Sequence, residues 1–187
     1  PMEFAEVASM AMELLAAPYL NGESGGLFDK ADAARWRTSH MEKIILFWPY
    51  MAVVDAFQHW VYGNIDEAMD PMACDEKWGE LWQRFIPAVD FSDYKDVLQT
   101  GWHRKQHIFS ASFYYIEYGL AQVGAVQIWR NALQDQAAAV KEYRHALSLG
   151  GTRGIPGLYE AAGAKFGFDH ATMSDVVSLL EEQLAQL

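Results

Sequence analysis

The sequence predicts an all-α fold, a multi-helix bundle of about seven helices, and three observations predict it. Apolar residues recur at steps of three and four along most of the chain, as on one face of a helix. No stretch shows the alternation of a half-buried strand, and neither a repeat nor a low-complexity segment divides the chain. At 187 residues with 51% apolar content the chain can bury a sizeable core, so we expect residues 1–187 to form a single helical domain.

Two long helices are expected at the start of the chain. Apolar residues follow one helical face from Phe4 to Leu20, and the residues from Asn21 to Gly26 form a loop. A longer pattern runs from Asp29 to Tyr62, and we expect Pro49 to kink it, because proline removes a hydrogen bond and clashes with the preceding turn. The first helix starts without a visible cap, so we expect the chain to be a fragment of a longer protein.

Shorter helices are expected in the middle of the chain. Residues 64–71 form a polar connector, residues 75–85 a short helix that Pro87 ends, and residues 90–102 a weaker helical stretch. A long apolar helix follows at about residues 113–133, with a thin side that allows a neighbouring helix or a ligand to approach closely. The small residues of that side are Gly119, Ala121, Gly124 and Ala125.

Three more helices complete the predicted bundle. Residues 136–149 are helical, and Gly150-Gly151 stops that helix as a left-handed C-cap. Residues 156–165 form a short helix with a proline in its first turn. The last helix, residues 172–187, begins with an approximate capping box at Thr172.

Charge and cysteine content exclude several classes of protein. The formal charge is −11, from 25 acidic and 14 basic residues, which disfavours nucleic acid and anionic membrane surfaces because both need clustered cations. No run of eighteen apolar residues and no signal peptide are visible, so we expect no membrane association. The single cysteine, Cys74, cannot form an internal disulfide, which is typical of the reducing cytoplasm.

Three candidate motifs are weak. The glycine-rich segment Leu149–Gly154 lacks the Lys-Ser or Lys-Thr ending of a phosphate loop. Cys74 lies among carboxylates, which would raise the pKa of its thiol. His103 and His107 have the i, i+4 spacing of metal ligands on a helix, but no Glu follows the first histidine, and the alternative of one surface and one partnered histidine is favoured.

The most informative segment is Trp102–Gly119, WHRKQHIFSASFYYIEYG, in which His107 precedes Tyr114, Tyr115 and Tyr118. A phenol donates a hydrogen bond to an oxyanion without being charged, and an imidazole can donate or accept. Histidine with tyrosine is therefore a candidate transition-state clamp for carbonyl chemistry. The alternative is that these aromatic side chains belong to the core.

Four segments resemble one known family. They are HIFSASFYYIEYG (107–119), FAEVASMAME (4–13), PYMAVVDAFQH (49–59) and LSLGGTR (147–153). Together they resemble the carboxy-terminal half of the oligoendopeptidase F and thimet oligopeptidase family, so the resemblance covers nearly the whole chain. Members of that family are helical zinc metallopeptidases that cut short peptides inside a deep channel. Two histidines of an HExxH helix and a glutamate on the next helix hold the zinc ion.

The resemblance implies roles for several residues. Glu6 corresponds to the zinc-ligating glutamate, and Glu13, two helical turns further on, could support the site only from farther away. His107 would stabilise the reacting carbonyl, and Tyr118 and Tyr114 would donate to the oxyanion, with Tyr115 as a competitor. Removing one oxyanion donor typically costs on the order of 3 kcal/mol of transition-state stabilisation.

The sequence departs from the family at one decisive point, because none of its six histidines begins an HExxH string. Two zinc ligands and the general base are therefore missing. We expect zinc in the complete enzyme, little or none bound by this chain, and no peptide hydrolysis by this chain alone. The missing amino-terminal part and short peptides are the expected partners, and exposed apolar surface favours a homo-oligomer. The alternative is a non-catalytic helical domain that binds peptides or a protein.

Overall fold

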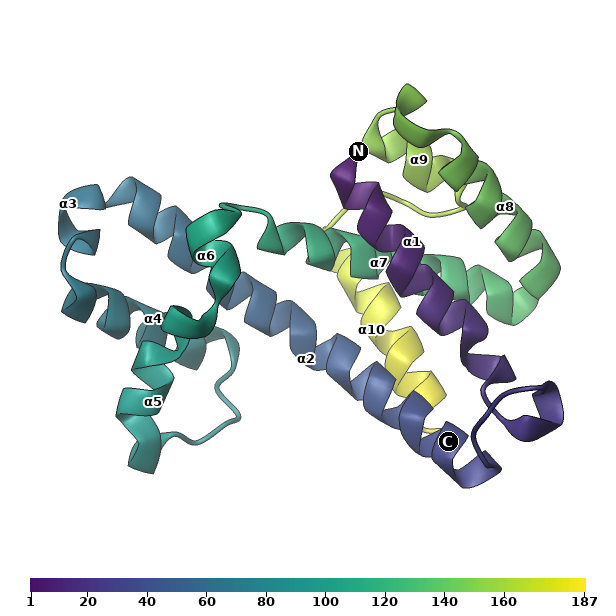
Figure 1. Cartoon of the computed structure of the whole chain (residues 1–187), viewed down its shortest axis with the longest axis horizontal. Coiled ribbons are helices and arrows are strands. Elements are labelled where there is room, and N and C mark those ends of the chain that lie inside the picture. The colour runs from purple at the N-terminus through teal and green to yellow at the C-terminus, as the bar shows by residue number, and fades with distance from the viewer. The chain divides into compact units, whose positions relative to one another are not determined.

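The computed structural model describes residues 1 and 3–187 with their side chains, and residue 2 by its place in the first helix (Figure 1). The α-helices are α1 (Met2–Ala16), α2 (Lys30–Gly63), α3 (Ile65–Ala68), α4 (Pro71–Phe85), α5 (Lys95–Gln99), α6 (Gln106–Ser110), α7 (Tyr115–Gln134), α8 (Gln136–Ser148), α9 (Ile155–Ala161) and α10 (His170–Leu184). Short 3₁₀ helices lie at Ala17–Tyr19, Gly22–Ser24, Ser92–Tyr94, Thr100–Arg104 and Gly150–Thr152. Among the described residues, extended pairing is limited to a single bridge between Asn21 and Phe28, which confirms the all-α prediction.

The chain divides into two compact units. Unit 1 comprises residues 1–45 and 120–187, and unit 2 comprises residues 46–119. Helices α2 and α7 each contribute residues to both units, and the divisions fall after Ile45 and after Gly119. The helix α2 is continuous through Pro49, so this proline does not end it, and a kink at Pro49 stays a prediction.

The length and hydropathy of α2 also bear on membrane association. Its most apolar window of eighteen residues has a mean hydropathy of 1.2, and 33% of that window is buried. By length and composition alone α2 would qualify as a membrane span, which the apolar runs of the sequence do not predict. A core helix of a soluble protein meets the same criterion, so one such helix is weak support for a membrane protein.

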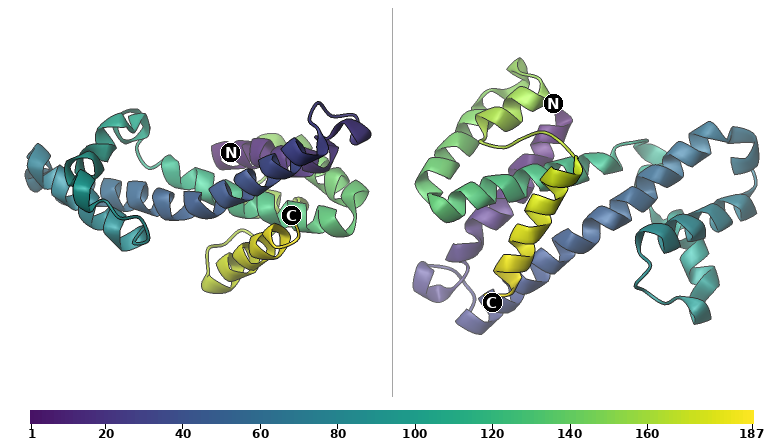
Figure 2. Two further views of the ribbon diagram at one scale, coloured as in Figure 1. Left: turned by 90° about the horizontal axis from the view of Figure 1, so that it is seen from below. Right: turned by 180° about the vertical axis from the view of Figure 1, so that it is seen from behind.

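In unit 1, helix α1 lies beside α8 and α9 (Figures 1 and 2). Its apolar face is buried, with Val7 fully inaccessible. The Tyr143 hydroxyl of α8 donates to the Ala8 carbonyl at 2.7 Å, and the Phe4 ring meets the Tyr159 ring edge-on at 5.7 Å. Helix α1 ends at Ala16, four residues earlier than predicted, where the chain passes into a 3₁₀ turn that contains Pro18.

Two further contacts fix the carboxy-terminal part of unit 1. The buried amide of Gln127 accepts from the Lys165 main-chain N–H at 2.9 Å and donates to the Lys165 carbonyl at 2.9 Å. The N-cap of α10 is Asp169, whose carboxylate accepts from the Thr172 N–H at 2.9 Å, so the predicted capping box beginning at Thr172 is wrong by three residues. The predicted left-handed stop is confirmed at Gly150, whose φ is +53°.

Unit 2 is organised around a core rich in aromatic side chains. Its buried residues are Met51, Val53, Val54, Phe57, Cys74, Trp78, Leu81 and Tyr115. Trp78 is fully buried and meets the Phe57 ring edge-on at 5.3 Å. The predicted connector of residues 64–71 contains the short helix α3, and α4 begins at Pro71 because the Asp70 carboxylate caps it by accepting from the Met72 N–H.

Candidate active site

Unit 2 brings His107 and the three candidate tyrosines together. His107 lies on α6, and the tyrosines lie at the start of α7 or directly before it. The Tyr118 hydroxyl is 3.4 Å from His107 Nε2, and the His107 ring centroid is 5.0 Å from that of Tyr115 and 6.4 Å from that of Tyr114. The four aromatic side chains therefore form one cluster, as the sequence predicts.

A strained turn places α6 and α7 next to each other. Phe113 has a φ of +61°, a left-handed conformation that costs energy for a side chain without a local polar partner. Its ring packs against His59 at 4.9 Å and Tyr62 at 5.0 Å, and the Tyr62 hydroxyl is 2.7 Å from Ser112 Oγ. Helix α7 therefore starts after this turn, two residues later than predicted, and the sequence offers no glycine or asparagine that would indicate the turn.

The tyrosines differ in burial and in hydrogen bonding. Tyr115 is 6% exposed, and burial, with smaller effects from Tyr50 and Tyr118, raises the pKa of its phenol far above the usual range. The Tyr115 hydroxyl accepts a hydrogen bond from Lys105 Nζ at 3.1 Å. Tyr114 and Tyr118 are half-buried.

A small cavity opens beside the cluster. It has a volume of about 240 Å³ and is lined by Gln106, His107, Ser110, Ala111 and Tyr114. His107 and Tyr114 thus border a space that a small chemical group can enter, whereas Tyr115 does not line it.

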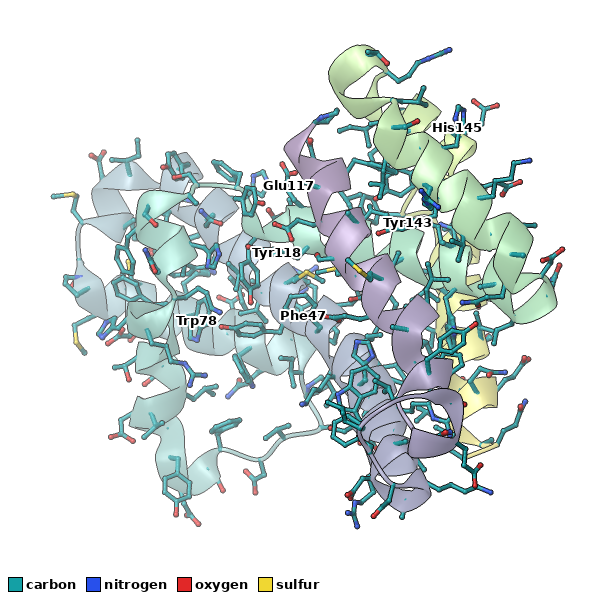
Figure 3. All side chains as sticks on the ribbon, turned by 45° about the vertical axis from the view of Figure 1, so that its right-hand side comes forward. Phe47, Trp78, Glu117, Tyr118, Tyr143 and His145 are labelled. Carbon is teal, nitrogen blue, oxygen red and sulfur yellow. The ribbon has the colours of Figure 1, made fainter. Side chains whose placement is uncertain are left out.

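Helix α2 holds the first turns of α7 in place. The Trp48 indole N–H donates to the Gly119 carbonyl at 3.3 Å, and the Phe47 ring lies 6.4 Å from that of Tyr118 (Figure 3). A Cβ at Gly119 would lie 2.9 Å from Met51 Cε, so the glycine permits this close approach. The side of small residues predicted for this helix therefore allows α2 to approach closely next to Tyr118.

The cluster contains hydrogen-bond donors rather than a nucleophile. The lone thiol, Cys74, is buried and lies 3.4 Å from the Ala68 carbonyl. Burial raises its pKa, with further increases from Asp75 and Asp70, as the acidic surroundings predict. His107 and Tyr114 beside the cavity, with the Tyr118 hydroxyl 3.4 Å from His107 Nε2, are suited to stabilising a developing oxyanion.

The histidine pair considered as a metal site does not form one. His103 lies in the 3₁₀ helix Thr100–Arg104 and His107 in α6, with Lys105 between them in a non-helical conformation. His103 is exposed and lies 3.5 Å from the Asp75 carboxylate. The premise of one continuous helix face is therefore wrong, and the alternative of a partnered histidine is confirmed for His103.

Glu6 lies on α1 in unit 1, where it is half-buried. Glu13, two turns further along α1, is 57% exposed and lies 3.1 Å from His40 Nε2 of α2. Burial lowers the pKa of His40, while Glu13 opposes that effect.

The residues that the structure describes do not supply a set of metal ligands. Within residues 1 and 3–187, no group of three histidine, cysteine, aspartate or glutamate side chains is placed to hold a metal ion. Zinc sites in proteins use at least three such ligands. A single carboxylate at Glu6 does not fit a zinc ion without ligands from elsewhere.

Comparison with known proteins places the chain in a family. Among curated proteins no match is found. Three solved structures match, and all cover 99–100% of this chain. The first, a candidate oligoendopeptidase F, shares 34% identity with a TM-score of 0.88, and PZ peptidase A with an inhibitor shares 30% with a TM-score of 0.89. A candidate oligoendopeptidase F from Bacillus anthracis str. Ames shares 27% identity with a TM-score of 0.79.

The chain spans only part of these relatives. It covers 32% of the length of the first two solved chains and 29% of the third. The sequence model of peptidase family M3 matches residues 1–176. The chain therefore belongs to peptidase family M3.

Proposed function

We propose that residues 1–187 form the carboxy-terminal part of one catalytic domain of a cytoplasmic, zinc-dependent oligoendopeptidase that hydrolyses internal bonds of short peptides. Membership of family M3 and similarity to oligoendopeptidase F over the whole chain support this proposal. The single, buried cysteine fits a reducing compartment.

The observation that carries the proposal is the pairing of His107 with Tyr118 beside a cavity. The Tyr118 hydroxyl and His107 Nε2 are 3.4 Å apart, and Tyr114 lines the adjoining cavity with His107. In the proposed reaction His107 and Tyr118 donate hydrogen bonds to the oxyanion that forms when water attacks the scissile carbonyl. Tyr114 is the phenol of the cluster that lines the cavity, next to His107.

The proposed role of Glu6 is that of one metal ligand. The remaining two ligands and the base that takes the proton of the attacking water would come from a segment outside this chain. This chain alone is therefore proposed to be inactive, and no step of the reaction at the metal is assigned to its own residues.

A chimera tests the proposal. The chain replaces the matched 32% of PZ peptidase A, which is 30% identical and has a TM-score of 0.89. We expect the chimera to cleave an internally quenched peptide, to lose this activity with a chelator and to regain it with zinc, while the isolated chain cleaves nothing. Chelator-sensitive hydrolysis by the isolated chain would contradict the proposal.

The alternative function, a non-catalytic helical domain that binds peptides, predicts a different result. The chimera would then fold and bind the peptide, measured by calorimetry with a non-cleavable analogue, but would not hydrolyse it. A chimera that binds zinc and peptide without turnover would replace our proposal with this alternative.

A further inference from the structure

Lys105 occupies a place among the aromatic side chains of unit 2. Its ammonium group lies 4.6 Å from the ring centroid of Tyr115 and 4.9 Å from that of Tyr50. The same nitrogen donates to the Tyr115 hydroxyl at 3.1 Å. Lys105 is half-buried, and burial, with a smaller effect from Arg104, lowers its pKa. A cation between two rings with a phenol acceptor is a fixed group rather than a mobile surface lysine.

Tyr115 connects Lys105 to His107. The Tyr115 ring meets the His107 ring edge-on at 5.0 Å and the Tyr118 ring edge-on at 5.4 Å. It also meets Phe47 at 5.9 Å and Tyr50 at 5.8 Å. The ring of Tyr115 therefore forms the wall against which His107 and Tyr118 pack.

The hydroxyl of Tyr115 is buried and already has a hydrogen-bond partner. It is engaged by Lys105, its residue is 6% exposed, and it does not line the cavity beside His107. Tyr118 does not line this cavity either, but it is only half-buried and its hydroxyl is 3.4 Å from His107 Nε2, so it is the more accessible of the two phenols.

We propose that Lys105 is a positioning residue: its ammonium group fixes Tyr115 as the wall of the cluster and thereby sets the orientation of His107 and Tyr118. Tyr115 is accordingly a structural member of the cluster, and the oxyanion donors are His107 and Tyr118. This inference deepens the proposed function and rests on it for its catalytic meaning. The arrangement itself is a property of this chain and can be measured in it.

The first experiment uses nuclear magnetic resonance on the chain itself. The imidazole ¹⁵N signals of His107 and the Cζ ¹³C signal of Tyr115 are assigned with His107→Gln and Tyr115→Phe. Lys105→Met keeps an unbranched apolar side chain of similar length but removes the charge and the donor. We expect both the His107 and the Tyr115 signals to move in Lys105→Met and to return towards their original positions in Lys105→Arg.

The matched control is Lys141→Met, which removes an exposed lysine on α8 in unit 1. It should leave both signals in place. Amide signals of unit 2 distant from Lys105, together with those of unit 1, show whether each variant is folded, and Lys105→Gln is used if Lys105→Met does not fold. Unchanged His107 signals in a folded Lys105→Met chain would overturn the proposal, and so would a change confined to Tyr115.

The second experiment measures kinetics in the chimera with PZ peptidase A. A misplaced donor lowers turnover rather than binding, so we expect Lys105→Met to reduce kcat about ten- to hundredfold with little change in KM. Lys105→Arg should recover most of that loss. An equal kcat for Lys105→Met and the unsubstituted chimera would refute the positioning role. If the unsubstituted chimera is inactive, the proposed function fails, while the spectra of the isolated chain still decide the arrangement around Lys105.

Discussion

The candidate site residues of the two units differ in how the chain holds them. In unit 2, His107 and Tyr118 contact each other, and the Tyr115 ring contacts both. In unit 1, Glu6 lies on a helix that Tyr143 fixes through the Ala8 carbonyl (Figure 3), and no described histidine, cysteine or acid completes a metal site with it. The described residues thus bring His107 and the tyrosines of the proposed site together, whereas they place no second or third metal ligand beside Glu6.

We expect the largest effect from replacing Glu6, which tests the metal part of the proposed site. In the chimera, Glu6→Gln removes the charge of the proposed ligand, so we expect the zinc content to fall. We expect kcat/KM to fall as well, by an amount that corresponds to a loss of several kcal/mol of transition-state stabilisation. Metal analysis and peptide hydrolysis measure both quantities. Glu3→Gln, three residues earlier on α1, is the matched control and should retain zinc. If both variants lose zinc equally, Glu6 has no special role.

Truncating one core side chain in each unit should affect the His107 signals differently. Trp78 in unit 2 and Leu180 in unit 1 are both fully buried. We expect Trp78→Ala to destabilise the chain by about 3–5 kcal/mol and Leu180→Ala by about 2–5 kcal/mol, from lost burial and the cavity that remains. Urea unfolding measures the loss of stability, and the His107 signals should move in Trp78→Ala much more than in Leu180→Ala. Equal movement of these signals in both variants would show that the cluster does not belong to unit 2 alone.

Replacing three glycines by alanine, one at a time, compares how closely helices pack in the two units. A Cβ at Gly124 would lie 2.6 Å from the rigid Tyr159 ring, so Gly124→Ala should destabilise unit 1 by about 1–3 kcal/mol. At Gly119 the nearest atom is the flexible end of Met51, whose displacement offsets the helix-forming gain of about 1 kcal/mol, so the net change should be small. Gly157 meets only Arg153 Cβ at 3.8 Å, and Gly157→Ala should stabilise α9 by about 0.5–1 kcal/mol. Thermal unfolding of the three variants would contradict this account if Gly124→Ala were the most stable.

The smallest expected effect is the dependence of stability on alkaline pH. Burial raises the folded-state pKa of Tyr115 above its ordinary value of 10.0, so the folded chain retains a proton that the unfolded chain releases. The stabilising contribution is present in full below pH 10 and is lost as the pH rises through the raised pKa. Tyr115→Phe should therefore flatten the fall of Tm above pH 10, and Tyr94→Phe, which alters an exposed tyrosine, should not. Identical slopes in the two variants would argue against a buried Tyr115 phenol.

The sequence predicted helices α1 and α8 because their apolar periodicity is strong. It missed the start of α4, although Asp70 followed by Pro71 is a recognisable cap signal, because the preceding polar residues suggested a connector. The turn at Phe113 could not be predicted, because tertiary packing against His59 holds a left-handed conformation that phenylalanine itself does not favour.

The candidate site was predicted in composition but not in detail. The sequence identified His107 and the three tyrosines as candidates, but their contact depends on the turn at Phe113, which the sequence does not indicate. The sequence could not rank the tyrosines, since the burial of Tyr115 and its contact with Lys105 depend on side chains from α2. Lys105 was not singled out, and a lysine beside a histidine gives no signal of its own.

The most direct test of the central claim compares Tyr118→Phe with Tyr115→Phe in the chimera with PZ peptidase A. Both changes remove one hydroxyl and keep the ring, so packing is nearly constant. We predict that Tyr118→Phe lowers kcat about 10²- to 10³-fold, the effect of losing one oxyanion donor, and that Tyr115→Phe lowers it about tenfold at most. A larger loss for Tyr115→Phe than for Tyr118→Phe would contradict the assignment of the oxyanion donors and the role of Lys105 together.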